Sequence, residues 1–231
     1  KEAYNTYEFH QVYHAAHNFC TVHMSAFYLD VLKDRLYTYA ANSTGRKSAQ
    51  TVLAVVLDHL VRLLAPVLPF TCEEVWRHLP ASLKTAESVH LTEFPAENPE
   101  HLLPEELITR WDNLLRIRGQ VSKQLEEARR AEMIGSSLQA AVSLVPGDEE
   151  VLNVLNQFRD QLEDIFIVSK CVIEPIADIP ETAEARVAVT VSVAPGKKCV
   201  RCWHIRETVG TIEHHPDICH VCAKQLGVTP G

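Results

Sequence analysis

Four cysteines near the C-terminus have the type and spacing needed to bind a metal ion. Cys199, Cys202, Cys219 and Cys222 follow the pattern C-x₂-C-x₁₆-C-x₂-C, which is typical of a zinc site. Two residues between the members of a pair let both thiolates point at one ion, and two such pairs complete a tetrahedron. Protein then fills every coordination position and leaves none for a water nucleophile. The pattern therefore predicts one structural zinc ion.

Other uses of these cysteines remain open from the sequence. A four-cysteine set can hold iron, as in a rubredoxin-like redox module, and a single C-x-x-C pair can be a redox dithiol. A nearby histidine could also replace a cysteine as a ligand, and the segment contains His204, His214, His215 and His220. Because four thiolates already satisfy a zinc ion, we interpret these imidazoles as surface groups or as supports of the ligands.

The same segment carries basic and aromatic side chains. They are Lys197, Lys198, Arg201, Trp203 and Arg206. A Trp ring beside cations can stack on an unpaired base while the cations bind phosphates, as in many complexes with RNA loops. Trp203 could equally fill the small core of a module that has few other large apolar residues. The sequence alone does not decide between these interpretations.

A second local excess of basic residues surrounds a predicted connection between helices. It contains Lys33, Arg35, Arg46 and Lys47. The net charge of the chain is −8, which argues against nucleic-acid binding over the whole surface because phosphate contacts need clustered Lys and Arg. Any RNA contact is therefore expected to be local, and either basic cluster could also be a solvated surface patch.

Composition indicates a globular protein of a reducing compartment. The 231 residues suit two domains, and 46% of them are hydrophobic with no apolar run long enough to cross a membrane. An odd cysteine count of seven is atypical of a secreted disulfide framework, so we expect a cytoplasmic location. Cys20, Cys72 and Cys171 lie singly in apolar patterns and are interpreted as inert thiols. The first residues resemble neither a signal peptide nor a natural start, which suggests a fragment.

Helical periodicity dominates the first part of the chain. Apolar residues at spacings of three and four predict one long helix over 5–37, with Val22 among the residues of its buried face, and a second helix over 46–64. A capping box at Thr71 predicts a short helix through Trp76. After an irregular crossover, a near-heptad register then predicts a helix from Pro104 to Gly135, which would be the left-handed residue that ends it.

The periodicity changes to two after Gly135. Alternating apolar residues predict a strand over 138–144, Asp148 is expected to cap a helix, and β-branched runs predict strands over 165–173 and 186–193. The predicted fold is mainly α. It comprises a helical bundle over 1–135, a small α+β unit over 136–195 and a C-terminal Cys₄ zinc knuckle module over 196–231.

No catalytic motif accompanies these elements. The sequence has no G-x-x-x-x-G-K-[ST] phosphate loop, no G-x-G-x-x-G, no G-x-S-x-G and no H-E-x-x-H. The paired carboxylates Glu73-Glu74 and Glu126-Glu127 fall on predicted helices, where a solvated face explains them. We therefore predict a binding module that has no catalytic site of its own.

Four longer runs of sequence resemble a known family. NFCTVHMSAFYLDVLKDRLY and LLAPVLPFTCEEVWRHLP resemble the anticodon-binding helical domain of class I aminoacyl-tRNA synthetases for branched aliphatic amino acids. IGSSLQAAV and KCVRCWHIRETVG…HPDICHVC resemble the bacterial isoleucyl-tRNA synthetase family in particular. The likeness covers essentially the whole chain.

The resemblance implies that this chain is the C-terminal part of such a synthetase. The nucleotide-binding and editing domains would be absent, as are the HIGH and KMSKS signatures, so that ATP-dependent ligation of isoleucine belongs to a cytoplasmic, monomeric parent enzyme. This part would bind the anticodon stem and loop of isoleucine tRNA and pack with the remainder of the same chain. The implied zinc ligands are Cys199, Cys202, Cys219 and Cys222, and the implied RNA contacts are Arg201, Trp203, Arg206, Arg35, Arg46 and Lys47. A zinc-ribbon adaptor for proteins and a rubredoxin-like redox module remain the alternatives.

Overall fold

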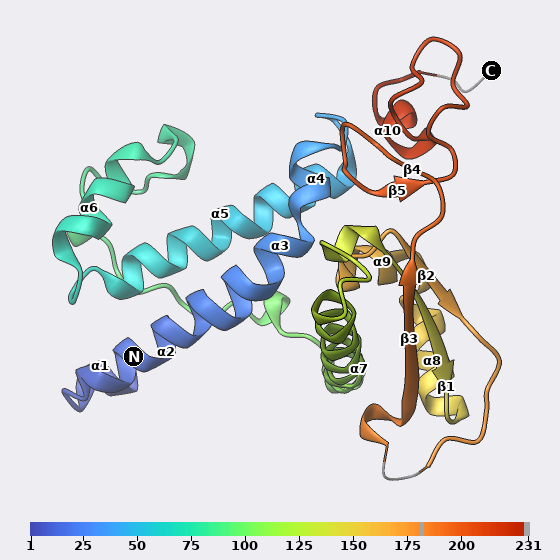
Figure 1. The fold of residues 1–231 in the computed structure, drawn as a ribbon. Coiled ribbons are helices and arrows are strands. Elements are labelled where there is room, and N and C mark those ends of the chain that lie inside the picture. Colours follow the sequence, from blue (N-terminus) through green and yellow to red (C-terminus); the bar gives the residue numbers. More distant parts are fainter. Residues whose placement is uncertain (181–182, 229–231) are drawn as a thin grey trace. The chain divides into compact units, whose positions relative to one another are not determined.

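The computed structural model describes residues 1–180 and 183–228, which form two compact units (Figure 1). The helical unit comprises Lys1–Leu29 and Ala41–Leu102, and the sheet unit comprises Asp30–Ala40 and Leu103–Gly231. A short piece of the N-terminal helical segment therefore belongs to the unit that also contains the C-terminal cysteines. None of the helices in the described ranges has both the length and the apolarity needed to cross a lipid bilayer.

The first segment of the chain is helical almost throughout, but its winding changes. α1 (Glu2–Asn5) and α2 (Phe9–Asn18) are followed by η1 (Phe19–Tyr28), which is a π-helix. Its i→i+5 hydrogen bonds place more residues in each turn than an α-helix does. Spacings of three and four therefore no longer keep side chains on one face, and Val22, expected in the buried face, is 51% exposed.

α5 (Thr44–Leu64) and α6 (Pro69–His78) complete the regular part of the helical unit. The side chain of Ser43 caps α5 by accepting a hydrogen bond from the N–H of Arg46. The predicted capping box at Thr71 is wrong, because α6 begins two residues earlier at Pro69, whose missing N–H suits a first helical position.

The crossover that follows α6 is irregular, as predicted, with three short 3₁₀ turns. These are η2 (Ala81–Leu83), η3 (Val89–Leu91) and η4 (Pro99–His101). It closes over the fully buried Trp76, whose Nε1–H donates to the carbonyl of Ala86 at 3.0 Å. The core around this ring contains Val61, Ala65, Cys72, Leu79 and Val89.

In the sheet unit, α7 (Glu105–Arg130) packs on the sheet. Its buried residues recur at helical spacing and are Leu114, Ile117, Val121, Leu125 and Ala128. The helix ends before Gly135. The left-handed conformation predicted for Gly135 is instead found at Glu132 (φ 56°). The domain boundaries predicted at residues 135 and 195 remain a prediction.

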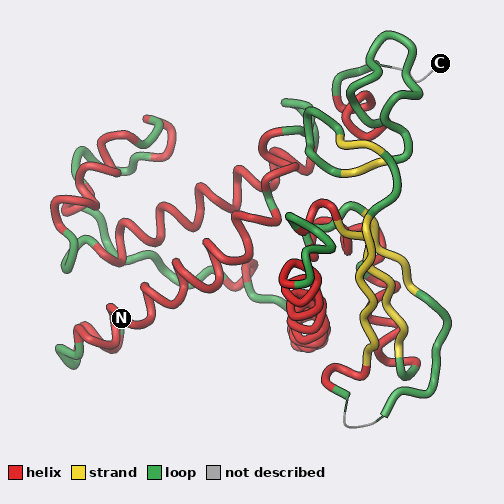
Figure 2. The backbone as a smooth tube through the Cα atoms, in the orientation of Figure 1, coloured by secondary structure: helices red, strands yellow, loops and turns green. Residues whose placement is uncertain are grey.

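Three strands form the main sheet, in the order β2-β1-β3 (Figure 2). They are β1 (Ala140–Pro146), β2 (Lys170–Ile173), which is parallel to β1, and β3 (Val187–Val193), which is antiparallel to it. Ala140, Val142 and Leu144 alternate into the core, which confirms the predicted period of two.

The connection from β1 to β2 is mostly helical. α8 (Glu149–Gln157) is capped by Asp148, which accepts from the N–H of Val151 at 2.9 Å, as predicted. The strand predicted from residue 165 is partly wrong, because Ile165 and Phe166 end α9 (Leu162–Phe166) and Ile167 turns the chain with φ 59°. The remaining 3₁₀ turns are η5 (Ser137–Gln139), η6 (Arg159–Gln161) and η7 (Glu184–Arg186).

Five further short elements complete the sheet unit. α3 (Leu29–Val31), at the border of the two units, leads into α4 (Lys33–Tyr37). The cysteine segment contains the two-residue strands β4 (Lys197–Lys198) and β5 (Ile205–Arg206), then α10 (His220–Gln225). Gly196 opens this hairpin with φ 113°, and a Cβ there would lie 2.3 Å from the backbone carbon of Arg206, so only glycine fits.

Candidate zinc centre and RNA-binding surface

The four predicted cysteines converge on one point of the sheet unit. The ligand atoms of Cys199, Cys202, Cys219 and Cys222 all lie within 4.8 Å of one another. The first pair lies on the turn between β4 and β5, and the second pair lies at the start of α10. Within the described part of the chain, these four cysteines are the one group of three or more side chains that lie close enough together to hold a metal ion.

The sulfur separations fit a tetrahedral zinc ion. The Sγ atoms of Cys199 and Cys222 are 3.8 Å apart, and so are those of Cys202 and Cys219. A zinc–sulfur distance of about 2.3 Å gives a tetrahedron with edges of about 3.8 Å, whereas a disulfide would need a separation of about 2.05 Å. The four cysteines therefore form a closed site for one structural zinc ion.

Contacts within the cluster lower the pKa of Cys219 and raise those of Cys202 and Cys222. Hydrogen bonds from the thiols of Cys202 and Cys222 lower the pKa of Cys219 well below its usual range. The backbone N–H of Cys219 donates to the sulfur of Cys199 at 3.4 Å, and the backbone of His204 donates to the sulfur of Cys202. Such donors stabilise thiolates, and zinc displaces the remaining thiol protons when it binds.

The cysteines themselves make up much of the small core of the module. It contains Cys199, Val209, Ile212, Ile218, Cys219, Cys222 and Ala223. No side chain in this core is larger than Ile, and three of the seven are ligands. A core of this size has little apolar surface to bury, so the ion must supply much of the folding free energy.

Trp203 lies outside this core. The residue is 61% exposed, and the Nζ of Lys198 lies over its ring, 5.3 Å from the ring centroid. The residue therefore does not fill the core of the module, and a cation lies over its ring. Trp203 and His204 line a cavity of about 390 Å³, together with Asp34, Tyr37 and Asp164. Burial raises the pKa of the Asp164 carboxyl.

The remaining basic residues of the module differ in their surroundings. Lys197 and Lys198 lie exposed on β4. Arg201 is half-buried and hydrogen bonds to the sulfur of Cys222, although its Nη1 has no hydrogen-bond partner among the residues that the structure describes. Arg206 is held within the unit, because its Nη1 donates to the carbonyl of Ser169 at 2.6 Å and contacts Glu163 at 2.7 Å.

The second basic cluster is divided between the two units. Arg35 lies on α4, where its Nη2 is 3.4 Å from the side-chain oxygen of Gln161 and its charge acts on the carboxyl of Asp164. Arg46 and Lys47 lie in the first turns of α5, and the side chain of Lys47 is exposed. The structure therefore brings together Lys197, Lys198, Arg201 and Trp203 on the zinc module.

Sequence reasoning missed how the module is held in the sheet unit. His204 is only 5% exposed, and its Nε2 lies 2.8 Å from Oδ2 of Asp34 on α4. The buried Ser169 accepts from the N–H of Ile205 at 2.6 Å. The side chain of Gln225 on α10 accepts from the N–H of Ala40 at 2.8 Å. No local pattern marks these partners, because they are far apart in the chain.

Two cysteines outside the cluster have unreactive environments. Burial raises the pKa of Cys171 to about 12 and also raises the pKa of Cys72. Their thiols therefore stay protonated at neutral pH and are poor nucleophiles.

Two family models match this chain, one over its N-terminal part and the other over the cysteine segment. Residues 1–144 match the model described as the anticodon-binding domain of tRNA ligase. Residues 196–225 match the model described as a zinc finger found in FPG and IleRS, and this range includes all four cysteines. The two matched ranges contain every basic and aromatic residue that the sequence singled out for RNA contacts.

Comparison with curated proteins gives similarity along nearly the whole chain. It is 46% identical to the isoleucine–tRNA ligase of Syntrophotalea carbinolica over 230 residues, which are 98% of this chain and 24% of that protein. It is 48% identical to the isoleucine–tRNA ligase of Desulforudis audaxviator over 229 residues, and 46% identical to that of Geobacter sulfurreducens over 224 residues. The chain thus spans about a quarter of the length of these relatives.

Proposed function

Because this chain belongs to the family of anticodon-binding domains of tRNA ligases, we propose that it is the tRNA-recognition region of an isoleucine–tRNA ligase. Its partner is isoleucine tRNA, which it contacts at the anticodon stem and loop. The similarity to isoleucine–tRNA ligases extends through the zinc module as well as the helices, which supports the choice of amino acid.

The observation that carries this proposal is the exposed ring of Trp203 on a zinc-stabilised turn. An unpaired base needs a flat, rigid apolar surface to stack on, and its phosphate needs a cation nearby. Trp203 supplies the ring and Lys198 lies beside it. Lys197 extends the positive charge along β4, and the ligated cysteines keep the turn in place. Arg201, Arg206, Arg35, Arg46 and Lys47 complete the proposed contact set.

The activity of the whole protein lies outside this chain. We propose that the rest of the ligase carries the ATP-dependent attachment of isoleucine and the editing of mischarged tRNA. This region contributes recognition, because the zinc module offers bases and phosphates an aromatic and basic surface. The remainder of the same chain is thus its second partner, in a monomeric, cytoplasmic enzyme.

A titration tests the proposal directly and gives the first prediction. The chain should bind isoleucine tRNA more tightly than a tRNA for a chemically distant amino acid, with an affinity that falls roughly twentyfold between 50 and 200 mM salt. The reason is that about three cations, chiefly Lys197, Lys198 and Arg201, would each release a counterion from the RNA. Filter binding or anisotropy at several salt concentrations measures this slope.

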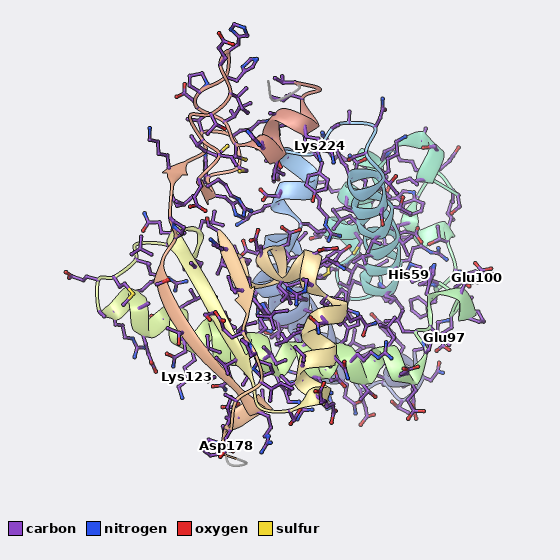
Figure 3. All side chains as sticks on the ribbon, turned by 90° about the vertical axis from the view of Figure 1, so that its right-hand side faces the viewer. His59, Glu97, Glu100, Lys123, Asp178 and Lys224 are labelled. Carbon is purple, nitrogen blue, oxygen red and sulfur yellow. The ribbon has the colours of Figure 1, made fainter. Side chains whose placement is uncertain are left out.

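A matched pair of lysine variants sharpens the same titration. Lys197→Ala should lower the log–log salt slope by about 0.7, the value for one phosphate contact to a single strand. Lys123→Ala, an exposed lysine on α7 (Figure 3), should leave the slope unchanged. If wild type shows no salt-dependent RNA affinity, a protein-binding adaptor becomes the better assignment. A coloured, iron-loaded sample would favour a redox module.

Replacing Trp203 with Ala is expected to weaken tRNA binding by about 1 to 3 kcal/mol, the range for losing one stacked base. Zinc content should not change, because the ring lies outside the core of the module. The control is Val200→Ala, which trims another exposed apolar side chain on the same turn and should not alter affinity. Loss of zinc from the Trp203 variant would show that the ring is structural, and the stacking contact would then be rejected.

A further inference from the structure

Asp34 comes from the N-terminal part of the chain and binds directly to the zinc module. Its Oδ2 lies 2.8 Å from Nε2 of the buried His204. A carboxylate only accepts, so Nε2 must donate. On the other side of the ring, Nη2 of Arg206 lies 3.5 Å from Nδ1 and can only donate. Both partners thus select the same tautomer, with the proton on Nε2, and fix the orientation of the imidazole.

His204 directly follows Trp203, so anything that fixes His204 also fixes the backbone of Trp203. The N–H of Trp203 donates to the carbonyl of Cys199 at 3.0 Å, and the carbonyl of His204 accepts from the N–H of Cys199 at 2.9 Å. Between these bonds Trp203 has φ 66°, a left-handed conformation that a bulky residue rarely adopts. Such a conformation persists only where the surroundings hold it on both sides.

The zinc ligands hold the backbone on both sides of Trp203, because Cys199 donates to the carbonyl of His204 and the sulfur of Cys202 accepts from the backbone of His204. The side chain of His204 is held instead by Asp34 and Arg206. The N–H of Ile205 is held by Ser169, and Gln225 ties α10 to Ala40. Of these three contacts from outside the module, the one made by Asp34 acts on the residue closest in sequence to Trp203.

We infer that Asp34 is a positioning residue for RNA binding. Through His204 it keeps Trp203 in the left-handed conformation that directs the ring to solvent beside Lys198. This inference rests on the proposed function, since it assigns a role in presenting the same stacking surface. Asp34 itself touches no RNA in this scheme.

The sign of the effect separates positioning from simple electrostatics. Asp34 is an anion in the same cavity wall as Trp203. If charge alone mattered, removing it would strengthen binding to a polyanion. If positioning matters, Asp34→Ala should weaken binding although it removes a negative charge. Asp34→Asn should preserve binding or strengthen it, because the amide oxygen still accepts from Nε2 while the charge is gone.

The experiment uses the full chain with an isoleucine tRNA transcript as the probe. Asp34→Ala is expected to lower affinity roughly tenfold, within the range for one lost stack, while Asp34→Asn binds at least as tightly as wild type. Asp178→Ala removes the same charge at an exposed site at the far end of the sheet unit from Lys224 (Figure 3) and should bind normally. Combining Asp34→Ala with Trp203→Ala should cost no more than Trp203→Ala alone, because the ring is already gone.

A second readout does not depend on RNA. Acrylamide quenching of tryptophan fluorescence, taken as the difference from Trp203→Phe, reports on the Trp203 ring, since Trp76 is fully buried and Trp111 is packed on Phe158. Asp34→Ala should change this quenching, and Asp34→Asn should not. If wild type fails to bind tRNA, the proposed function fails, and the quenching still decides whether Asp34 holds the ring.

Several outcomes would overturn the inference. One is an Asp34→Ala protein that keeps its zinc, shows wild-type quenching and binds tRNA as tightly as wild type or more so. Another is full additivity in the double variant. Should Asp34→Ala lose zinc, His204→Phe breaks the same hydrogen bond from the other side while keeping a ring of similar size. Unchanged quenching and affinity in that variant would also reject the role of this pair.

Discussion

Replacing Cys219 with Ser should release the zinc ion and unfold residues 196–226 while the rest of the chain stays folded. Cys219 is fully buried, lies 3.8 Å from Cys202 and belongs to a core in which three of seven residues are ligands. Apparent zinc-binding free energies of about 10 to 16 kcal/mol in zinc-finger peptides show how much stability such a core takes from its ion. Far-ultraviolet circular dichroism should barely change, because α10 and two short strands are the regular structure lost.

The control for this variant is Cys171→Ser. Cys171 lies on β2 outside the metal cluster, so the same chemical change there should leave zinc content and tRNA affinity intact. In Cys219→Ser alone, the zinc content measured by mass spectrometry should fall, hydrogen exchange of residues 196–226 should become faster, and tRNA affinity should decrease. Melting of the helices on zinc removal would show that the module belongs to their core. Unchanged tRNA affinity would remove the module from the RNA-binding surface.

Replacing Trp76 with Ala should destabilise the helical unit by about 3 to 5 kcal/mol, the usual cost of truncating a buried aromatic side chain. Trp76 is fully buried among Cys72, Leu79 and Val89, and its loss also leaves the carbonyl of Ala86 without the indole donor. Zinc content should stay normal, because the ligands lie in the other unit. Urea denaturation followed by circular dichroism measures the effect.

Phe70→Ala provides the matched control for that experiment. Phe70 is an aromatic residue of the same helix but is 89% exposed, so its truncation should change stability by less than about 0.5 kcal/mol. Equal effects of the two substitutions would contradict the core assigned to α6. A loss of zinc in Trp76→Ala would contradict the independence of the two units.

Local patterns predicted the elements whose partners lie close in the chain. The alternation of Ala140, Val142 and Leu144 predicted β1, and Asp148 was identified as a cap because capping acts over three residues. The zinc ligands were equally predictable, because two short C-x-x-C turns specify their own geometry. In each case the interactions that determine the structure are made between residues only a few positions apart.

Features set by packing were missed or misplaced. The apolar spacing of residues 19–28 fits an α-helix, yet the segment winds as a π-helix and Val22 is exposed. β-branched Ile165 and Ile167 favoured a strand, but the first lies in α9 and the second takes a left-handed turn. Glu163 and Ser169, which bind the guanidinium of Arg206, could not be predicted as its partners because they are distant from it in sequence.

The pairs that hold the zinc module link the two ends of the chain, and this affects how the protein can be made. Asp34 and His204 are 170 residues apart, and Ala40 and Gln225 are 185 apart. At about 5 to 20 residues per second, the Asp30–Ala40 segment leaves the ribosome roughly 10 to 40 s before its partner has been synthesised. During that interval Asp34 and Ala40 lack these two partners, so a stalled or nicked chain would keep this part of the segment accessible to chaperones and proteases.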